Sequence, residues 1–237
     1  MRFDFDVHDL GRLPYRDAWD VQLRRHAAVA DGREAPTLLL VEHPPVLTFG
    51  KKGGRRHLLV SEAEARARGF DLFDVERGGD VTYHGPGQLV GYPIFPIGRR
   101  VRDYLRALED VMVRTFAAFG LTTTGSPGYA GVWFGDEKLV AIGVAIKRNV
   151  SFHGFAMNVH TDLARFDAIV PCGLHDKGVT SLSRVLERHV GLDEVKPPLL
   201  AAFRETFHGS CAPLDDTTAP PRKDLARKDL ARKDLVA

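Results

Sequence analysis

Residues 138–159 read Lys138-Leu-Val-Ala-Ile-Gly-Val-Ala-Ile-Lys-Arg-Asn-Val-Ser-Phe-His-Gly-Phe-Ala-Met-Asn-Val159. Two apolar runs of alternating pattern lie on either side of Arg148-Asn149. Asparagine tolerates a positive φ angle, so this dipeptide predicts a tight β-hairpin with a two-residue loop. In such a hairpin Lys147 pairs with Val150, and the register of all other pairs follows from that one.

The predicted register places four very small residues on one face of the hairpin. Gly143 lies opposite Gly154, Ala141 lies opposite Ala156, and opposed residues share a face. Either a helix packs closely on this patch, or a flat or chain-like ligand lies directly on the backbone. A register slip of one residue would abolish the patch.

Lys138 begins the first strand of the hairpin and follows a turn-like segment, Phe134-Gly-Asp-Glu137. Strict alternation puts Lys138 on the face opposite to Ala141 and Gly143. Strong twist or a β-bulge at the start of the strand is needed to bring it to their face.

The rest of the chain alternates strand-like and helix-like segments, which indicates an α/β (α+β) fold. We expect one domain over residues 1–212, with a mixed, largely antiparallel sheet flanked by helices. Residues 213–237 contain a repeated five-residue unit and are predicted to be a low-complexity, disordered tail, or a short solvated helix. The predicted helices are 14–30, a short one capped by Ser61, 101–119, 180–190 and 198–207. The predicted strands are 37–43, 71–75, 80–84, 88–95, 130–134, 138–147 and 150–159.

Composition excludes several classes of protein. The 237 residues are 44% hydrophobic and carry a formal net charge of +2, which gives no reason to expect nucleic-acid or membrane binding. No apolar run approaches the roughly 20 residues that span a bilayer. The N-terminus is acidic, and two cysteines make no disulfide framework, so we expect a cytoplasmic protein with reduced thiols.

Five glycines punctuate the segment Arg77-Gly-Gly-Asp-Val-Thr-Tyr-His-Gly-Pro-Gly-Gln-Leu-Val-Gly-Tyr-Pro93. It lacks the Gly-Lys-Ser/Thr of a phosphate-binding loop and opens a strand rather than a helix, so it predicts neither a nucleotide nor a dinucleotide site. Its Gly85-Pro86-Gly87 portion predicts a turn between two strands. His84 is either a hydrogen-bonding support or a general base. The histidine and cysteine spacings match no zinc pattern, so no metal site is predicted.

Pro171-Cys172-Gly173 forms a second candidate site, because its proline and glycine favour an open turn that presents the thiol. A free cysteine is also commonly inert and buried. If Lys138 lies beside Cys172, its ammonium group lowers the pKa of the thiol and the two groups can exchange a proton. Cys211 has no predicted role.

Four runs together resemble the lipoyl(octanoyl) transferases, within the lipoate and biotin protein ligase superfamily. They occur in the order of that family, and the resemblance extends over about residues 4–208. The runs are Arg77 to Gln88, Lys138 to Gly143, Ser151 to Asn158 and Pro171 to Gly173.

The resemblance implies that Cys172 carries an octanoyl group as a thioester, with Lys138 as its acid/base partner and no cofactor. The donor is then octanoyl-acyl carrier protein, and the acceptors are lipoyl domains of 2-oxoacid dehydrogenase complexes and the glycine cleavage system protein. It also implies a substrate site made of Arg77, Gly78, Gly79, Asp80, Val81, Thr82, Tyr83, His84, Ala141, Ile142, Gly143, Gly154, Phe155 and Ala156. Seven basic residues are either contacts for an acidic carrier protein or a merely solvated surface: Lys51, Lys52, Arg55, Arg56, Arg99, Arg100 and Arg102.

Three other functions stay open at this point. An ATP-dependent lipoate ligase of the same superfamily would carry an acidic residue after the histidine, where this chain has Gly85, and would need no cysteine. A thioesterase would use Cys172 with His84 or His153 and release free acid. A non-catalytic acyl-binding module would keep Cys172 for structure alone.

Overall fold

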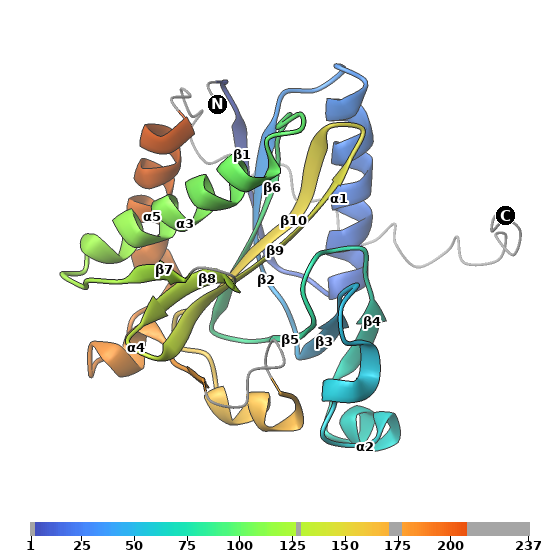
Figure 1. The fold of residues 1–237 in the computed structure, drawn as a ribbon, viewed down its shortest axis with the longest axis vertical. Coiled ribbons are helices and arrows are strands. Elements are labelled where there is room, and N and C mark those ends of the chain that lie inside the picture. Colours follow the sequence, from blue (N-terminus) through green and yellow to red (C-terminus); the bar gives the residue numbers. More distant parts are fainter. Residues whose placement is uncertain (1–2, 127–128, 171–176, 208–237) are drawn as a thin grey trace, which may run out of the picture.

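The computed structural model describes residues 3–126, 129–170 and 177–207, and in these ranges two β-sheets are flanked by helices (Figure 1). The larger sheet has the strand order β1-β2-β6-β10-β9-β8-β7, with β11 paired to β9, and the smaller has the order β4-β3-β5. Parallel pairing joins β1 to β2, β3 to β4 and β9 to β11, and the other neighbours are antiparallel. The expected mixed, largely antiparallel sheet is confirmed. The strands are β1 (Asp6–Arg12), β2 (Thr37–Glu42), β3 (Val46–Phe49), β4 (Asp71–Asp74), β5 (Val81–His84), β6 (Gln88–Ile94), β7 (Thr124–Ser126), β8 (Tyr129–Phe134), β9 (Glu137–Lys147), β10 (Val150–Asn158) and β11 (Gly178–Val179).

Long helices cover the two faces of the larger sheet (Figure 1). Helix α1 (Tyr15–Ala30) packs on one face against β6 and β10, while α3 (Val101–Ala117) and α5 (Leu192–Phe207) pack together on the other. Helix α3 buries Tyr104, Leu108, Val111, Met112 and Phe116 on one face, and Gly120 follows the helix with a φ of +76°. No helix in the described ranges is long and apolar enough to cross a membrane. The short helices are α2 (Glu62–Ala67), α4 (Leu182–Val185), η1 (Gly54–His57) and η2 (Leu163–Ala168).

The predicted hairpin is confirmed, with its register. Arg148 and Asn149 have φ angles of +53° and +65°, as a two-residue turn with two left-handed residues requires. Strand pairing then runs from Lys147 opposite Val150, through the predicted pair of glycines, to the predicted pair of alanines and one residue beyond.

The two faces of this hairpin carry side chains of different size. Val140, Ile142 and Val144 of β9 belong to the apolar cluster formed with α3 and α5, as do Phe155 and Met157 of β10. The other face, which we call the small face, carries the four residues Ala141, Gly143, Gly154 and Ala156. Over Gly143 lies the Gly-rich segment rather than a helix, because a Cβ atom there would meet Gly78 O at 3.0 Å.

A β-bulge brings Lys138 to the small face. Strand β8 pairs Val132 with Val140 but Trp133 with Lys138, which leaves Leu139 as an extra residue in β9. Leu139 and Val140 both join the cluster under α3 and α5. Simple alternation therefore gave the wrong face for Lys138, and the bulge considered as its alternative is what the structure contains.

Several element boundaries differ from the predicted ones. The expected helix 180–190 is only the single turn α4, because Glu187 adopts a φ of +52° and breaks it. Helix α5 begins at Leu192, six residues before the predicted start, and Pro197 and Pro198 lie inside it, in its second turn. Strands β1, β3, β7 and β11 were not predicted. The Ser61 cap is confirmed, since its hydroxyl accepts from Glu64 N at 3.1 Å.

Candidate active site

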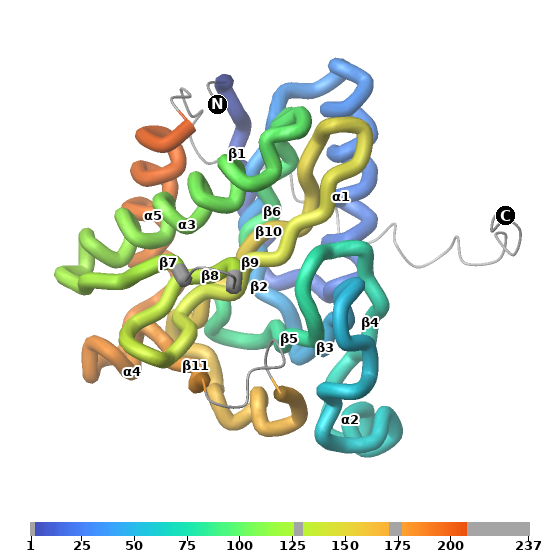
Figure 2. Tube along the Cα trace, viewed as in Figure 1, coloured from blue at the N-terminus to red at the C-terminus, as the bar shows by residue number. Residues whose placement is uncertain are grey.

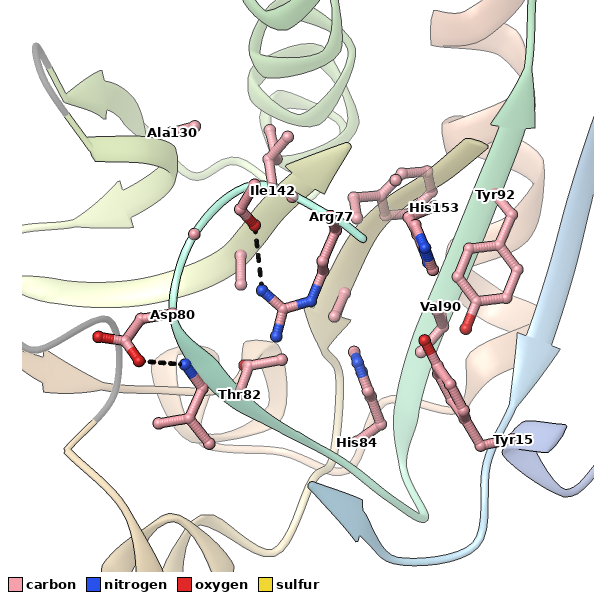
Figure 3. Close-up of a pocket in the computed structure, with 18 residues that line it drawn as sticks. Tyr15, Arg77, Asp80, Thr82, His84, Val90, Tyr92, Ala130, Ile142 and His153 are labelled. Carbon is pink, nitrogen blue, oxygen red and sulfur yellow. Dashed lines mark hydrogen bonds between the residues drawn. The ribbon is translucent and has the colours of Figure 1, made fainter. Parts of the chain in front are cut away.

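A pocket lies between the small face and the Gly-rich segment (Figure 3). Figure 2 traces this segment from β4 to β5 as it passes beside β9 and β10. Gly78 N donates to Val144 O at 2.9 Å, and the backbone of Lys51 and Lys52 donates in turn to Arg77 O and Gly79 O. The lining residues are Tyr15, Arg77, Gly78, Gly79, Asp80, Val81, Thr82, His84, Val90, Tyr92, Ala130, Ala141, Ile142, Gly143, His153, Gly154, Phe155 and Ala156.

All but one of the predicted substrate-binding residues line this pocket. The exception is Tyr83, whose ring packs at 5.7 Å from the Phe70 ring and 5.3 Å from the Phe166 ring, in a separate apolar cluster. Its neighbours in the strand face the opposite way, as the period of two requires. The Gly-rich segment and the β9–β10 hairpin, which are far apart in sequence, therefore line the same pocket.

Lys138 lies beside this pocket. It is 5% exposed, and its Nζ atom lies 4.6 Å from the centre of the Trp133 ring, a cation–π distance. It lines a smaller cavity that shares Thr82, Ala141 and Ala156 with the larger pocket. Cys172 falls within 171–176, outside the described residues, so its distance from Lys138 is not part of the structure.

Arg77 lies in the middle of the pocket lining, with His153 and Tyr92 to one side of it and Ile142 to the other (Figure 3). Its Nη2 atom donates to Thr48 O at 2.7 Å and to Thr48 Oγ1 at 2.9 Å. Its side chain is 7% exposed, so these hydrogen bonds form away from water.

Hydrogen bonds fix the tautomer of His84. The Gln88 amide nitrogen donates to Tyr83 O at 3.1 Å and to Asn158 Oδ1 at 2.9 Å, so its oxygen faces His84 Nδ1 at 2.8 Å. Nδ1 must then donate, and Nε2 accepts from the Thr48 hydroxyl at 3.4 Å. Burial lowers the pKa of His84 well below its usual value, so the ring is neutral. This arrangement favours the supporting role of His84 over general-base catalysis.

The same chain of hydrogen bonds reaches the strand that carries Lys138. Asn158 Nδ2 donates to Thr180 O at 3.0 Å, and Thr180 N donates to Lys138 O at 3.0 Å. The four side chains in this series of hydrogen bonds are all buried: His84, Gln88, Asn158 and Thr180. The backbone at Lys138 is therefore held by the same polar network that orients His84.

Buried aromatic and histidine side chains form the end of the pocket near α1. Tyr92 donates to His43 Nε2 at 2.7 Å, because His43 Nδ1 is occupied in donating to Leu13 O at 2.8 Å. Burial lowers the pKa of His43 to about 4 and raises the pKa values of Tyr15 and Tyr92. All of these groups are uncharged near neutral pH.

His153 lies at this end too, in the strained left-handed region with a φ of +55°. It is 2% exposed, and its Nε2 atom is 3.5 Å from Glu76 Oε2. Burial lowers the pKa of His153, although the Glu76 carboxylate acts in the opposite direction. The sequence analysis missed His153 as a lining residue, together with Tyr15, Val90, Tyr92 and Ala130. Val90 and Tyr92 lie inside the Gly-rich segment of residues 77–93, and His153 lies inside the hairpin segment of residues 138–159.

The predicted basic contacts fall into two separate groups. One group includes Lys51 and Lys52, whose backbone N–H groups donate to the Gly-rich segment beside the pocket. Within it, Arg55 is engaged in ion pairs with Glu62 and Asp74. The other group is Arg99, Arg100 and Arg102, which begins α3 beside the hairpin turn, where Gly98 N donates to Asn149 O at 3.0 Å.

No three histidine, cysteine, aspartate or glutamate side chains in the described part of the chain are grouped to hold a metal ion. His57 and Asp80 form an ion pair near the pocket. The Asp80 carboxylate also accepts from Val81 N at 2.6 Å.

The family model of the lipoyl protein ligase A/B catalytic domain matches residues 14–204. The chain belongs to this family. An octanoyltransferase of Deinococcus radiodurans is 50% identical over 218 residues, which cover 86% of this chain and 65% of the relative. One of Caldicellulosiruptor bescii is 43% identical, over 84% of this chain and 89% of the relative. The chain spans 45% of the length of another octanoyltransferase, from Porphyromonas gingivalis.

Solved structures of lipoyl protein ligases share the fold. A bipartite lipoate protein ligase of Thermoplasma acidophilum matches with a TM-score of 0.68 and 18% identity, over 91% of this chain and 87% of that one. Lipoate-protein ligase A bound with ATP matches with a TM-score of 0.68 and 18% identity, over 90% of each chain. The expected family resemblance and fold class are confirmed. At this identity the likeness concerns the fold alone.

Proposed function

We propose that this chain is an octanoyltransferase that moves an octanoyl group from octanoyl-acyl carrier protein to a lysine of a lipoyl domain. The acceptors are lipoyl domains of 2-oxoacid dehydrogenase complexes and the glycine cleavage system protein, and the reaction is the first step of endogenous lipoate synthesis in the cytoplasm. The similarity to the octanoyltransferases of Deinococcus radiodurans and Caldicellulosiruptor bescii supports this assignment.

The observation that carries the proposal is the position of Lys138. It is a buried amine side chain, turned by the Leu139 bulge onto the same face as Ala141 and Ala156. A buried amine beside a narrow, small-residue pocket suits proton transfer to and from a reacting group at the mouth of that pocket.

In the first step, the thiol of Cys172 attacks the thioester carbonyl of the donor. Lys138 accepts the thiol proton and returns a proton to the departing pantetheine sulfur, so one thioester replaces another. Backbone N–H groups near the thiol stabilise the tetrahedral oxyanion. No nucleotide enters this step.

In the second step, the acceptor lysine attacks the enzyme thioester. The C–N bond forms and the C–S bond breaks, while Lys138 takes a proton from the incoming amine and returns it to the sulfur of Cys172, which regenerates the thiol. An amide is more stable than a thioester, so this step is downhill.

The acyl chain lies on the small face during both steps. The small side chains of Ala141 and Ala156 leave room over the backbone of β9 and β10 for a chain-like ligand. The predicted substrate residues from Arg77 to His84, except Tyr83, face this space from the other side of the pocket.

Intact-mass spectrometry tests the thioester directly. The protein is mixed with octanoyl-acyl carrier protein in the absence of ATP, and the adduct is treated with hydroxylamine. The wild type is expected to gain the mass of one octanoyl group, and hydroxylamine should remove it. The Cys172→Ser variant is expected to show no adduct that hydroxylamine removes at that rate. Because the chain has only two cysteines, Cys211→Ser is the matched control and should behave as the wild type.

Other outcomes would identify the rival functions. Transfer that needs ATP and free octanoate would show a ligase. Release of free octanoate without an acceptor would show a thioesterase. If Cys172→Ser changed neither adduct formation nor transfer to a lipoyl domain, the cysteine would have no chemical role.

A further inference from the structure

Strand β8 lies along the part of β9 that carries Lys138 (Figure 1). Because of the bulge at Leu139, the residue of β8 that pairs directly with Lys138 is Trp133. Opposed residues of an antiparallel pair share a face, so the lysine and the tryptophan project to the same side of the sheet. The nearest cross-strand neighbour of the proposed acid/base group is therefore an indole ring.

Two residues of β8 lie along the side chain of Lys138. A Cβ atom on Gly131 would lie 3.5 Å from Lys138 Cε, so the aliphatic part of the lysine passes close to this glycine. The amine at its end lies over the Trp133 ring, with Nζ 4.6 Å from the ring centre. Both the lysine and the tryptophan are 5% exposed, so water competes little for the amine.

Trp133 contacts Lys138 through the face of its ring and not through its N–H group. Within the described residues, the buried Nε1 atom of Trp133 has no hydrogen-bond partner. A buried indole usually pairs this group, and an unpaired buried donor costs free energy. The ring contact with the lysine is the interaction that distinguishes this tryptophan from an ordinary apolar core residue.

The ring face suits the proton transfer that the proposed mechanism assigns to Lys138. When the amine accepts the thiol proton of Cys172 it becomes an ammonium group, and the face of an indole attracts a cation most strongly where water is excluded. The ring therefore stabilises the state in which the proton has left the thiol. It also holds Nζ at the cavity that joins the acyl pocket through Thr82, Ala141 and Ala156.

We propose that Trp133 is a positioning residue for the acyl transfer, which holds the Lys138 amine in place and favours its uptake of the thiol proton. The inference rests on the proposed acyltransferase function and adds a residue to its mechanism. Trp133 lines neither the acyl pocket nor the smaller cavity, so its effect on the reaction passes through the lysine.

The test measures octanoyl transfer by Trp133→Leu in two backgrounds, the wild type and Lys138→Met. In the wild-type background kcat should fall about 30-fold, the equivalent of about 2 kcal/mol for a desolvated cation–π contact. The KM for octanoyl-carrier protein should stay nearly unchanged. In the Lys138→Met background, the same substitution should lower the residual rate by less than about twofold, because the amine on which the ring acts is absent.

Two further variants accompany this comparison. Trp133→Phe keeps an aromatic face and should lower kcat only about threefold; it also replaces Trp133→Leu in both backgrounds if the leucine variant does not fold. Trp19→Leu is the matched control, because Trp19 carries the Arg16 guanidinium at 5.2 Å and lines neither cavity. It should retain the wild-type kcat.

A wild-type kcat in Trp133→Leu, or the same fold-loss in both backgrounds, would overturn the role of Trp133 and leave the proposed function intact. Equal losses in Trp133→Leu and Trp133→Phe would also overturn it, because the aromatic face would then not matter. A wild type that transfers no octanoyl group would instead overturn the proposed function. A loss of folded protein is measured by chemical denaturation and lowers the rate equally in both backgrounds.

Discussion

The two faces of the β9–β10 hairpin share one backbone but differ in the volume of their side chains. Toward α3 and α5, the hairpin presents large apolar residues that pack in the main hydrophobic core. Toward the Gly-rich segment, it presents the small face, and there a pocket remains. The first face supplies stability through buried apolar area. The second gives up that area, which is consistent with the binding of a ligand that supplies the missing contacts.

The strongest test of this comparison removes the charged group from the small face. Lys138→Met keeps the length of the side chain and should lower octanoyl transfer about 10³-fold, because an acid/base group is lost. The free energy of unfolding should change far less than the rate, so that the loss of transfer does not reflect a loss of folded protein. Transfer kinetics and chemical denaturation measure the two effects.

Lys196→Met is the control for that variant. Lys196 is a partly buried lysine that pairs with Asp9 at 2.6 Å and Asp193 at 2.7 Å, on helix α5. Its replacement should leave transfer intact. A Lys138→Met protein with more than a tenth of the wild-type rate would mean that the lysine has no part in the chemistry.

On the large-residue face, Met157→Ala should act on stability alone. Met157 is fully buried, and its truncation leaves a cavity, so the free energy of unfolding should fall by about 3 kcal/mol. Urea denaturation measures this loss. The rate of transfer per folded molecule should stay within about twofold of the wild type, and a larger drop would show that the two faces are not independent.

On the small face, Ala141→Leu should act on activity alone. Ala141 lines both cavities, so the added carbons narrow the passage, and octanoyl transfer should fall about 100-fold. A butanoyl donor, which needs less of the passage, should lose far less. Equal losses for both donors would place the acyl chain elsewhere. The midpoint of thermal unfolding should change little.

Behind the small face, His43 should make stability depend on pH. Its pKa is about 4 in the folded protein and about 6.5 when unfolded. As the pH falls below 6.5, the unfolded chain takes up the proton first, so stability is lost toward pH 4. From pH 7 to pH 5 this loss should be about 2 kcal/mol. His43→Gln cannot be protonated and should flatten the profile measured by denaturation; an unchanged profile would assign the effect to other groups.

Short-range rules were enough to predict the hairpin. The Arg148-Asn149 turn, the register from Lys147 and Val150 onward, and the patch of four small residues all depend on neighbours in sequence and on the period of a strand. The prediction of a substrate site from Arg77 to His84 rested on the resemblance, and the structure places all but Tyr83 of these residues around one pocket.

Features that depend on distant pairing were not predictable. The sequence carries no signal that β6 lies beside β10, and without that pairing Val90 and Tyr92 cannot be assigned to the pocket. The anchor of Arg77 on Thr48 depends on β3 pairing with β5 in the second sheet. Nor did alternation reveal the bulge at Leu139, because consecutive apolar residues fit a regular buried strand equally well. The roles of Cys172 and of the 213–237 tail remain predictions, since both lie outside the described residues.

The bulge in β9 has a consequence for anyone who transplants this site. Leu139 never touches the pocket, yet its burial among the residues under α3 and α5 is what turns Lys138 toward the small face. A designer who grafts the lysine onto a regular strand, at the same spacing from Ala141, would direct the amine into an apolar layer. Transfer of the site therefore requires both Lys138 and Leu139, together with an apolar environment in which the leucine side chain is buried.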